Sequence, residues 1–172
     1  MSDWRARPLR VKDIRTILTQ VGPLVTRLYP RGADLLLNRL EDAVEGYATA
    51  TVMTNERDLP VAFAAETAKG KSIRKISTFW VSPFVRGRGV GASLLDTIVQ
   101  SWRMRELDRT YVTVRLQRSE ELDRLFSQAG FKQHAYAPDR YGSGQHELVL
   151  DWNPDRPQYG RFGDSDSRRI AG

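Results

Sequence analysis

Hydrophobic residues in the first third of the chain recur at helical spacing, and this pattern predicts two consecutive helices. The first apolar stripe runs over 14–28 and the second over 35–44. A short strand at 8–11 is expected to precede them. The pair Gly22-Pro23 is expected to interrupt the first helix, and Gly46 is expected to end the second one as a C-cap.

The next part of the chain is rich in β-branched and aromatic residues, which predict strands. Three such runs occupy 47–53, 61–67 and 72–81. Short polar turns at 55–58 and 68–71 separate them. Strands joined by short turns pair with their neighbours in sequence, so an antiparallel meander is expected.

The second half of the chain returns to helical spacing and then alternates between the two patterns. One helical face is expected from a stripe of four apolar residues: Val90, Leu94, Ile98 and Trp102. A strand at 110–116, a helix at 119–130, and strands at 131–137 and 146–152 follow. This order of elements predicts an α/β fold, with a mixed central sheet of about seven strands and four helices.

A basic, glycine-rich loop follows the strand that ends at Val81 and opens the helix that begins at Val90. It reads Arg86-Gly87-Arg88-Gly89-Val90-Gly91. Glycines let the backbone approach a ligand closely because they have no Cβ. The unpaired N–H groups and the positive dipole end of a helix N-terminus attract phosphate groups. The loop is therefore predicted to bind a phosphate or a pyrophosphate.

This loop resembles the Arg/Gln-x-x-Gly-x-Gly/Ala motif of the GNAT family of N-acetyltransferases. In that family the loop holds the pyrophosphate of acetyl-CoA, and the backbone of the preceding strand binds the pantetheine arm. The resemblance implies acetyl-CoA as the cofactor, with contacts from the following residues: Phe79, Trp80, Val81, Arg86, Gly87, Arg88, Gly89, Val90 and Gly91. A backbone N–H near Trp80 and Val81 is expected to polarise the thioester carbonyl, where the fourth strand separates from the fifth.

The segment 125–131 resembles a second landmark of the family, a Leu-Tyr-x-x-x-Gly-Phe stretch at the end of the fourth helix. Together with the order of elements, the resemblance covers residues 5–152 and implies a GNAT fold. We therefore expect one acetyltransferase domain at 1–152. A disordered polar tail is expected at 153–172, because few core residues occur there.

The same glycines allow a second interpretation. Gly87-x-Gly89-x-x-Ala92 also fits the dinucleotide fingerprint of a Rossmann fold, with Asp108 at about the expected distance. The acidic residue of that fingerprint belongs at the far end of the next strand. Asp108 instead precedes the strand at 110–116, so the acetyl-CoA interpretation is preferred.

Acetyl transfer to an amine needs a base for the attacking ammonium and an acid for the leaving thiolate. The usual acid of the family is a tyrosine in the fourth-helix landmark, and Phe126 occupies that position here. We expect Tyr141, in the loop between the last two strands, to supply the acid instead. Glu66 is the candidate base, acting through water; a surface ion pair with Lys71 or Arg74 is the alternative.

Composition limits the partners that the chain can have. It contains no cysteine and two histidines, which argues against disulfides, thiol catalysis and a metal site. No apolar run at the N-terminus or of membrane length is present, so a cytoplasmic protein without membrane contact is expected. The net charge is +6, and residues 61–91 carry six basic side chains against one acidic. This basic surface suits coenzyme A, and it also allows weak contact with a nucleic acid.

These observations predict an acetyl-CoA-dependent N-acetyltransferase that acts on a primary amine. The acceptor is left open between a small molecule, a protein amine and an aminoacyl-tRNA, and homodimer formation is left open as well. The alternative function is a non-catalytic module that binds acyl-CoA or nucleic acid. Phe126 and the absence of a carboxylate from the strand at 72–81 support that alternative.

Overall fold

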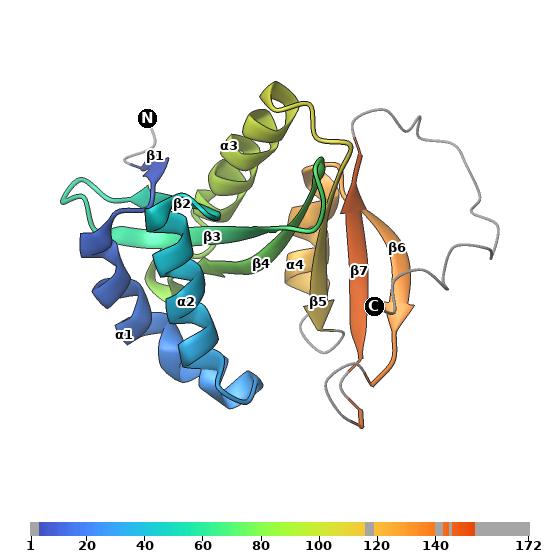
Figure 1. Ribbon diagram of the computed structural model, residues 1–172, viewed down its shortest axis with the longest axis horizontal. Helices are drawn as coiled ribbons and strands as arrows, with labels where there is room; N and C mark the ends of the chain where they lie inside the picture. The colour runs from blue at the N-terminus through green and yellow to red at the C-terminus, as the bar shows by residue number, and fades with distance from the viewer. Residues whose placement is uncertain (1–3, 116–118, 140–142, 145, 154–172) are drawn as a thin grey trace.

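The computed structural model describes residues 4–115, 119–139, 143–144 and 146–153 of the chain. In this part of the chain, seven strands form one sheet (Figure 1). Their order across the sheet is β1 (Arg5–Pro8), β2 (Thr49–Thr54), β3 (Pro60–Ala68), β4 (Ile73–Val81), β5 (Arg109–Arg115), β7 (Glu147–Trp152) and β6 (Lys132–Ala137). The described residues also form four α-helices: α1 (Val11–Leu28), α2 (Gly32–Glu45), α3 (Val90–Met104) and α4 (Ser119–Gln128).

The sheet is mixed. Strands β4 and β5 pair in parallel, and the other neighbouring strands of the described sheet pair antiparallel. This arrangement confirms the predicted fold class. A Rossmann sheet is mostly parallel, so the decision to reject a Rossmann fold for this chain is confirmed as well.

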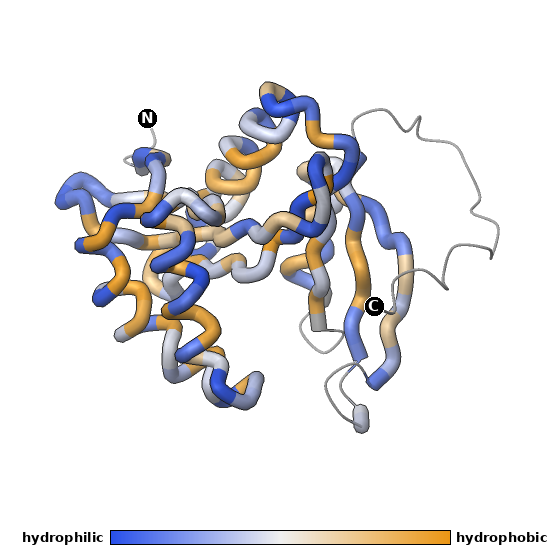
Figure 2. Tube along the Cα trace, viewed as in Figure 1, coloured by the Kyte–Doolittle hydropathy of each residue, from blue (hydrophilic) through white to orange (hydrophobic). Residues whose placement is uncertain are grey.

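The helices cover both faces of the sheet. α1 and α2 pack on one face, over a core that includes Leu36, Phe63 and Trp80. α3 and α4 pack on the other face, over a core that includes Trp102 and Phe126. Hydrophobic and hydrophilic positions alternate along α1 and α2 (Figure 2), as expected for helices that bury one side. Each face therefore has its own apolar core, and the sheet lies between the two.

The first helix differs from its prediction. α1 is continuous through Pro23, so the predicted interruption at Gly22-Pro23 is wrong. Proline removes one hydrogen bond of a helix. Ile17 and Val21 are almost completely buried against the sheet, and this burial holds α1 together in spite of that loss. β1 also lies earlier than predicted, because α1 already begins at Val11.

Glycines shape both ends of α2. Gly46 has φ 88° and ends the helix as a left-handed C-cap, which confirms its predicted role. Gly32 begins the helix where it meets α1: a Cβ there would lie 2.3 Å from the carbonyl oxygen of Val25. Only a glycine permits this close approach, which brings the end of α1 and the start of α2 together.

Part of the predicted organisation falls outside the described residues. This applies to 154–172, most of the expected tail, and to Tyr141. Among the described helices, none is long and apolar enough to cross a membrane.

Candidate active site

β4 and β5 separate from each other halfway along their length. They pair only over Ile73–Ile76 and Arg109–Val112. On the other edge of β4, Ala65 pairs with Thr78 whereas the next residue of β3 pairs with Ile76, so Ser77 is an extra residue in β4. Such a bulge bends the strand that carries it. The bend lies where the two strands part, and it opens a gap between them.

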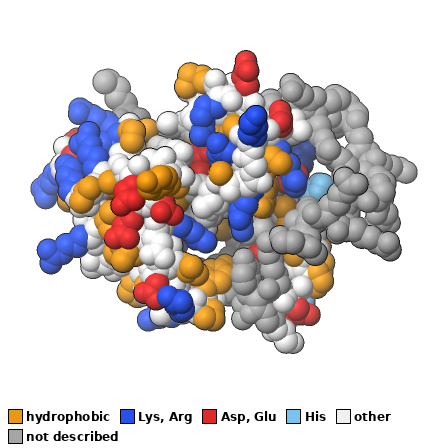
Figure 3. Space-filling model, viewed as in Figure 1, with side chains coloured by type: hydrophobic (Ala, Val, Ile, Leu, Met, Phe, Trp, Pro, Cys, Tyr) orange, Lys and Arg blue, Asp and Glu red, His pale blue; other side chains and the backbone are white. Residues whose placement is uncertain are grey.

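A cavity of about 450 Å³ occupies this gap. Its walls come from the end of α1, the start of α2, the strands β4 and β5, and one side of α4. The space-filling view shows a hollow between α2 and the half of the molecule that contains β5, with basic side chains at its edge (Figure 3). Phe79 and Phe126 line the cavity from the α4 side, and Arg39 lines it from α2.

Beyond Ile76, the edge of β4 that faces the gap has no partner strand among the described residues. Ser82 donates its N–H to the carbonyl oxygen of Val61 in β3, at 2.8 Å. Backbone groups of alternate strand residues point to opposite edges, so Trp80 also directs its N–H toward β3. Phe79 and Val81 direct theirs toward the gap. Of the three strand residues predicted to contact the cofactor, Phe79 and Val81 are thus the two whose backbone N–H groups point toward the gap.

The side chain of Trp80 has a separate role. It is 7% exposed and packs with Phe63 in the core beneath α1 and α2, with ring centroids 6.2 Å apart. Trp80 is therefore a core residue, and its side chain does not line the cavity.

The glycine-rich loop connects β4 to α3 and contains glycines of two kinds. Gly87 and Gly89 have φ of 72° and 79°, in the left-handed region that other residues avoid. A Cβ at either position would meet no atom within 4 Å, so the space outside the loop is open. Gly91 is different, because its Cβ would lie 3.2 Å from Cγ2 of Val81 and 3.5 Å from Cδ2 of Leu125. It allows α3 to pack tightly on β4 and α4.

The start of α3 presents backbone donors to this open space. The first helical hydrogen bond runs from the N–H of Ser93 to the carbonyl oxygen of Gly89, at 3.0 Å. The amides of residues 90–92 have no backbone acceptor within the described chain. Free amides at the positive end of a helix dipole form an anion-binding site. The glycine-rich loop thus places open backbone amides and open space together at the start of α3.

Two arginines lie beside these amides, and both are exposed. Arg86 donates a hydrogen bond from Nε to the carbonyl oxygen of Val81, at 3.2 Å. The guanidinium of Arg88 lies 5.5 Å from the ring centroid of Trp4. This cation–π contact holds Arg88 over the N-terminal segment and keeps its charge near the loop.

Phe126 is a buried part of the cavity wall. It is 1% exposed and makes edge contacts with Phe79 and Phe131, with ring centroids 5.4 Å and 4.9 Å away. The position where the family motif has a tyrosine is therefore occupied here by a side chain that packs against other aromatic rings and has no proton to donate. Four of the described residues that line the cavity carry a hydroxyl group: Tyr29, Ser77, Thr78 and Thr113. Sequence reasoning missed Tyr29, because nothing in the local pattern places the end of α1 beside β4.

Glu66 lies away from the cavity. Its side chain is buried on the α3 face, where Oε2 accepts hydrogen bonds from Nε1 of Trp102 at 2.8 Å and from Nη2 of Arg105 at 3.0 Å. The ion pair expected with Lys71 or Arg74 is wrong, since the partner in the structure is Arg105. This position does not support a role as the catalytic base, because Glu66 is not among the residues that line the cavity. In the described part of the chain, no group of three or more acidic or histidine residues could hold a metal ion.

Comparisons with known proteins agree with this geometry. The acetyltransferase (GNAT) domain family matches residues 34–145, which is more than half of the chain. No curated protein sequence matches significantly.

Solved structures resemble the chain at low sequence identity. A Salmonella typhimurium protein solved with its cofactor acetyl-CoA has a TM-score of 0.74 and 16% identity, over 92% of this chain and 98% of that one. Ribosomal-protein-S5-alanine acetyltransferase from Vibrio fischeri has a TM-score of 0.72 and 14% identity, over 91% and 97%. A variant of spermidine N-acetyltransferase from Vibrio cholerae has a TM-score of 0.72 and 14% identity, over 89% and 95%. These likenesses show a shared fold, and together with the matched domain they establish that the chain belongs to the GNAT family of acetyltransferases.

Proposed function

We propose that this protein is a cytoplasmic N-acetyltransferase that takes the acetyl group of acetyl-CoA and transfers it to a primary amine. The observation that supports the proposal most strongly is that two features lie next to each other at the end of β4. One is the glycine-rich loop with the open amides of residues 90–92, and the other is the strand edge that β5 leaves uncovered. Membership of the family and the cofactor of the Salmonella typhimurium protein support it.

The residues at the end of β4 fit this cofactor. The loop amides and the exposed Arg86 and Arg88 suit a pyrophosphate, and the open space around Gly87 and Gly89 leaves room for one. Bound acetyl-CoA supplies an acetyl group activated as a thioester. The backbone N–H groups of Phe79 and Val81 are the donors proposed to orient the pantetheine arm and the acetyl carbonyl.

A proton donor for the leaving sulfur has to come from outside the fourth-helix landmark, because Phe126 carries no acidic proton. We keep the Oη of Tyr141 as the proposed donor. The hydroxyl of Tyr29 is the alternative, because Tyr29 is one of the residues that line the cavity at the end of α1.

Binding of acetyl-CoA tests the first part of the proposal. Gly89→Glu should abolish binding in isothermal calorimetry, because a side chain and a negative charge would enter the phosphate site. Gly46→Glu is the matched control: Gly46 also has a left-handed φ, of 88°, and open surroundings, but it lies at the end of α2. The control should suffer similar backbone strain and keep wild-type affinity. Wild-type affinity in Gly89→Glu would overturn the assignment of the loop.

Turnover tests the second part. Addition of a panel of primary amines should release the free thiol of coenzyme A. Tyr141→Phe should lower turnover by about tenfold or more if Tyr141 is the acid, and Tyr29→Phe should do so if Tyr29 is. Tyr47→Phe is the control, since Tyr47 is 80% exposed on the surface. Tight binding of acetyl-CoA without thiol release for any amine would instead favour the non-catalytic module.

A further inference from the structure

Arg39 brings a positive charge from α2 to the point where β4 and β5 part. Its Nη1 lies 3.5 Å from the carbonyl oxygen of Ser77 and 3.4 Å from the hydroxyl oxygen of Thr78. The side chain is half-buried and lines the cavity. The guanidinium therefore lies at the bulge of β4, beside the place where the proposed function requires the amine to meet the acetyl group.

The guanidinium of Arg39 has no carboxylate partner among the described residues. Both of its hydrogen bonds are long and use Nη1, which leaves Nε and Nη2 without an acceptor in this part of the chain. A cation that loses water without gaining a counter-charge raises the free energy of the folded protein. A ligand with a carboxylate or a phosphate would remove that cost, because the planar guanidinium fork matches both groups.

The remaining cavity wall also suits an anionic ligand. Lys75 is the other charged residue of the described lining, which contains no Asp, Glu or His. A cationic amine such as a polyamine would therefore meet positive charge from this described wall, and no carboxylate of the wall would offset it. Val25, Leu28 and Leu35 add apolar surface from α1 and α2. The described wall thus offers positive charge beside apolar surface.

We propose that the amine acceptor of this protein is a small molecule that carries an anionic group, and that Arg39 binds this group. The group is a carboxylate or a phosphate close to the amine. A small acceptor fits better than a macromolecule, because Arg39 is half-buried within a cavity rather than exposed on a surface. This inference rests on the proposed acetyl transfer and names the class of its substrate.

Matched pairs of amines that differ only in the anionic group test the inference. Phenylalanine and phenethylamine form the carboxylate pair, and O-phosphoethanolamine and ethanolamine form the phosphate pair. In the wild-type protein, kcat/KM should favour the anionic member of one pair by about ten- to a hundredfold, the effect of a charge-assisted hydrogen bond. The pair that shows the preference identifies the anion. Calorimetric titration with the same four compounds gives a second measurement that does not depend on turnover.

Variants of Arg39 should change this preference and leave acetyl-CoA binding unchanged. Arg39→Gln should abolish it, and Arg39→Lys should retain part of it, because lysine keeps the charge but loses the fork. Arg103→Gln is the matched control: Arg103 is exposed on α3 and does not line the cavity. It should keep the full preference.

Two results would overturn the inference. One is equal kcat/KM and equal calorimetric binding within both pairs for the wild-type protein. The other is a preference that survives Arg39→Gln. Failure of the proposed function would give a different result from these two, because acetyl-CoA binding would be missing or no amine would release thiol. The calorimetric titrations would then still show whether Arg39 binds the anion.

Discussion

The role of a single residue in the sheet depends on the side chains of the helix that packs over it. Glu66 is the clearest case, because its carboxylate is buried under α3 and accepts hydrogen bonds from Trp102 and Arg105. The side chain of Arg105 is 34% exposed, whereas that of Glu66 is 2% exposed. If the carboxylate were removed, water could accept the hydrogen bond of the partly exposed Arg105. Water could not reach the buried indole N–H of Trp102, which would lose its acceptor.

We predict that Glu66 stabilises the fold rather than taking part in catalysis. Glu66→Ala should lower the free energy of unfolding by about 1–3 kcal/mol, since the buried N–H of Trp102 loses its acceptor. Glu66→Gln should cost less, because the amide oxygen can still accept that hydrogen bond. Urea denaturation and thiol-release assays on the same samples measure both effects. Glu41→Ala, at an exposed position of α2, serves as the control and should change neither.

A different result would restore the catalytic interpretation of Glu66. If Glu66→Gln unfolds like the wild type but turns over about a hundredfold more slowly, the carboxylate acts as a base.

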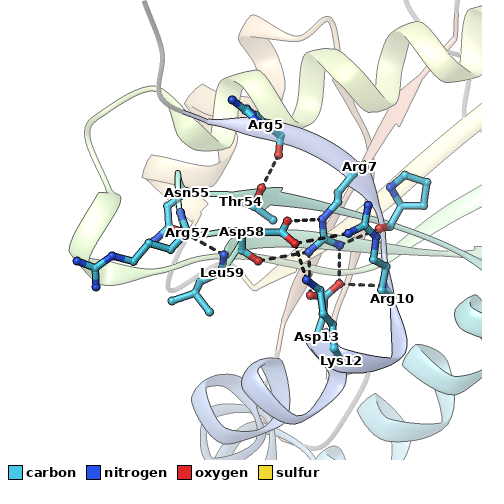
Figure 4. A network of polar contacts seen from close by, with 11 residues as sticks. Arg5, Arg7, Arg10, Lys12, Asp13, Thr54, Asn55, Arg57, Asp58 and Leu59 are labelled. Atoms are coloured by element: carbon cyan, nitrogen blue, oxygen red, sulfur yellow. Dashed lines mark hydrogen bonds and ion pairs between the residues drawn. The ribbon is translucent and has the colours of Figure 1, made fainter.

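At the scale of elements, a polar network fastens the start of the chain to the turn between β2 and β3 (Figure 4). Arg7 in β1 forms ion pairs with Asp13 of α1 at 2.6 Å and with Asp58 of the turn at 2.8 Å. Lys12 reaches the same Asp58 at 2.5 Å, and Arg10 reaches it at 3.5 Å. The hydrogen bond to Asp13 is the main cause that raises the pKa of Arg7 above its ordinary value. Three segments are thereby joined through two carboxylates.

This network predicts a loss of stability in acid. Hydrogen bonds from Lys12 and Arg7 lower the pKa of Asp58 to about 2, from an ordinary value of 3.8. A carboxyl group whose pKa is lower in the folded protein stabilises the fold at pH values above its ordinary pKa. This contribution disappears as the pH falls through the pKa of the folded state. The contribution of Asp58 should therefore be lost between about pH 4 and pH 2.

Thermal unfolding of the wild type and of Asp58→Asn across that range measures the effect. The melting temperatures of the two proteins should differ at neutral pH and converge toward pH 2. The control is Asp34→Asn, whose side chain is 65% exposed and whose Arg31 partner is 3.4 Å away. Its melting temperature should stay close to that of the wild type throughout, and a constant gap for Asp58→Asn would contradict the prediction.

At the scale of the whole molecule, the basic residues before the glycine-rich loop divide into two groups. Lys69 and Lys71 are exposed at the turn between β3 and β4. Arg74 donates hydrogen bonds to the carbonyl oxygens of Gly70 and Ile73, at 3.1 and 3.0 Å, and Lys75 lines the cavity. The four residues therefore do not present one continuous basic surface to a nucleic acid.

We predict only weak nucleic-acid binding from this arrangement. In filter binding across a salt series, each phosphate neutralised by Lys69 or Lys71 should add about 0.7–0.9 to the slope of log affinity against log salt. Alanine at both lysines should remove that slope, whereas Lys132→Ala, at an exposed position of β6, should leave it unchanged. Saturating coenzyme A should have no effect on it. Binding that disappears with coenzyme A would show that the nucleic acid occupies the cofactor site.

The amino-acid sequence by itself determined the order of the elements and the glycine-rich loop that opens α3. Hydrophobic spacing is a local property, so it predicted the helix at α3 and the meander of β2, β3 and β4 closely. The glycine-rich loop could also be predicted locally, because the backbone at Gly87 and Gly89 has a positive φ that favours glycine. Gly22-Pro23 misled the prediction of α1, since burial against the sheet outweighs a local helix breaker.

Only the tertiary structure decided which side chains surround the site. The bulge at Ser77 depends on the register between β3 and β4, and that register also sets the edge to which Trp80 directs its N–H. Arg39 lies 38 residues before Ser77 and reaches it because α2 packs on the sheet, over the core that contains Trp80 of β4. Glu66 meets Trp102 over 36 residues for the same kind of reason. Contacts between distant segments depend on how whole elements pack, and no local pattern of residue types records that.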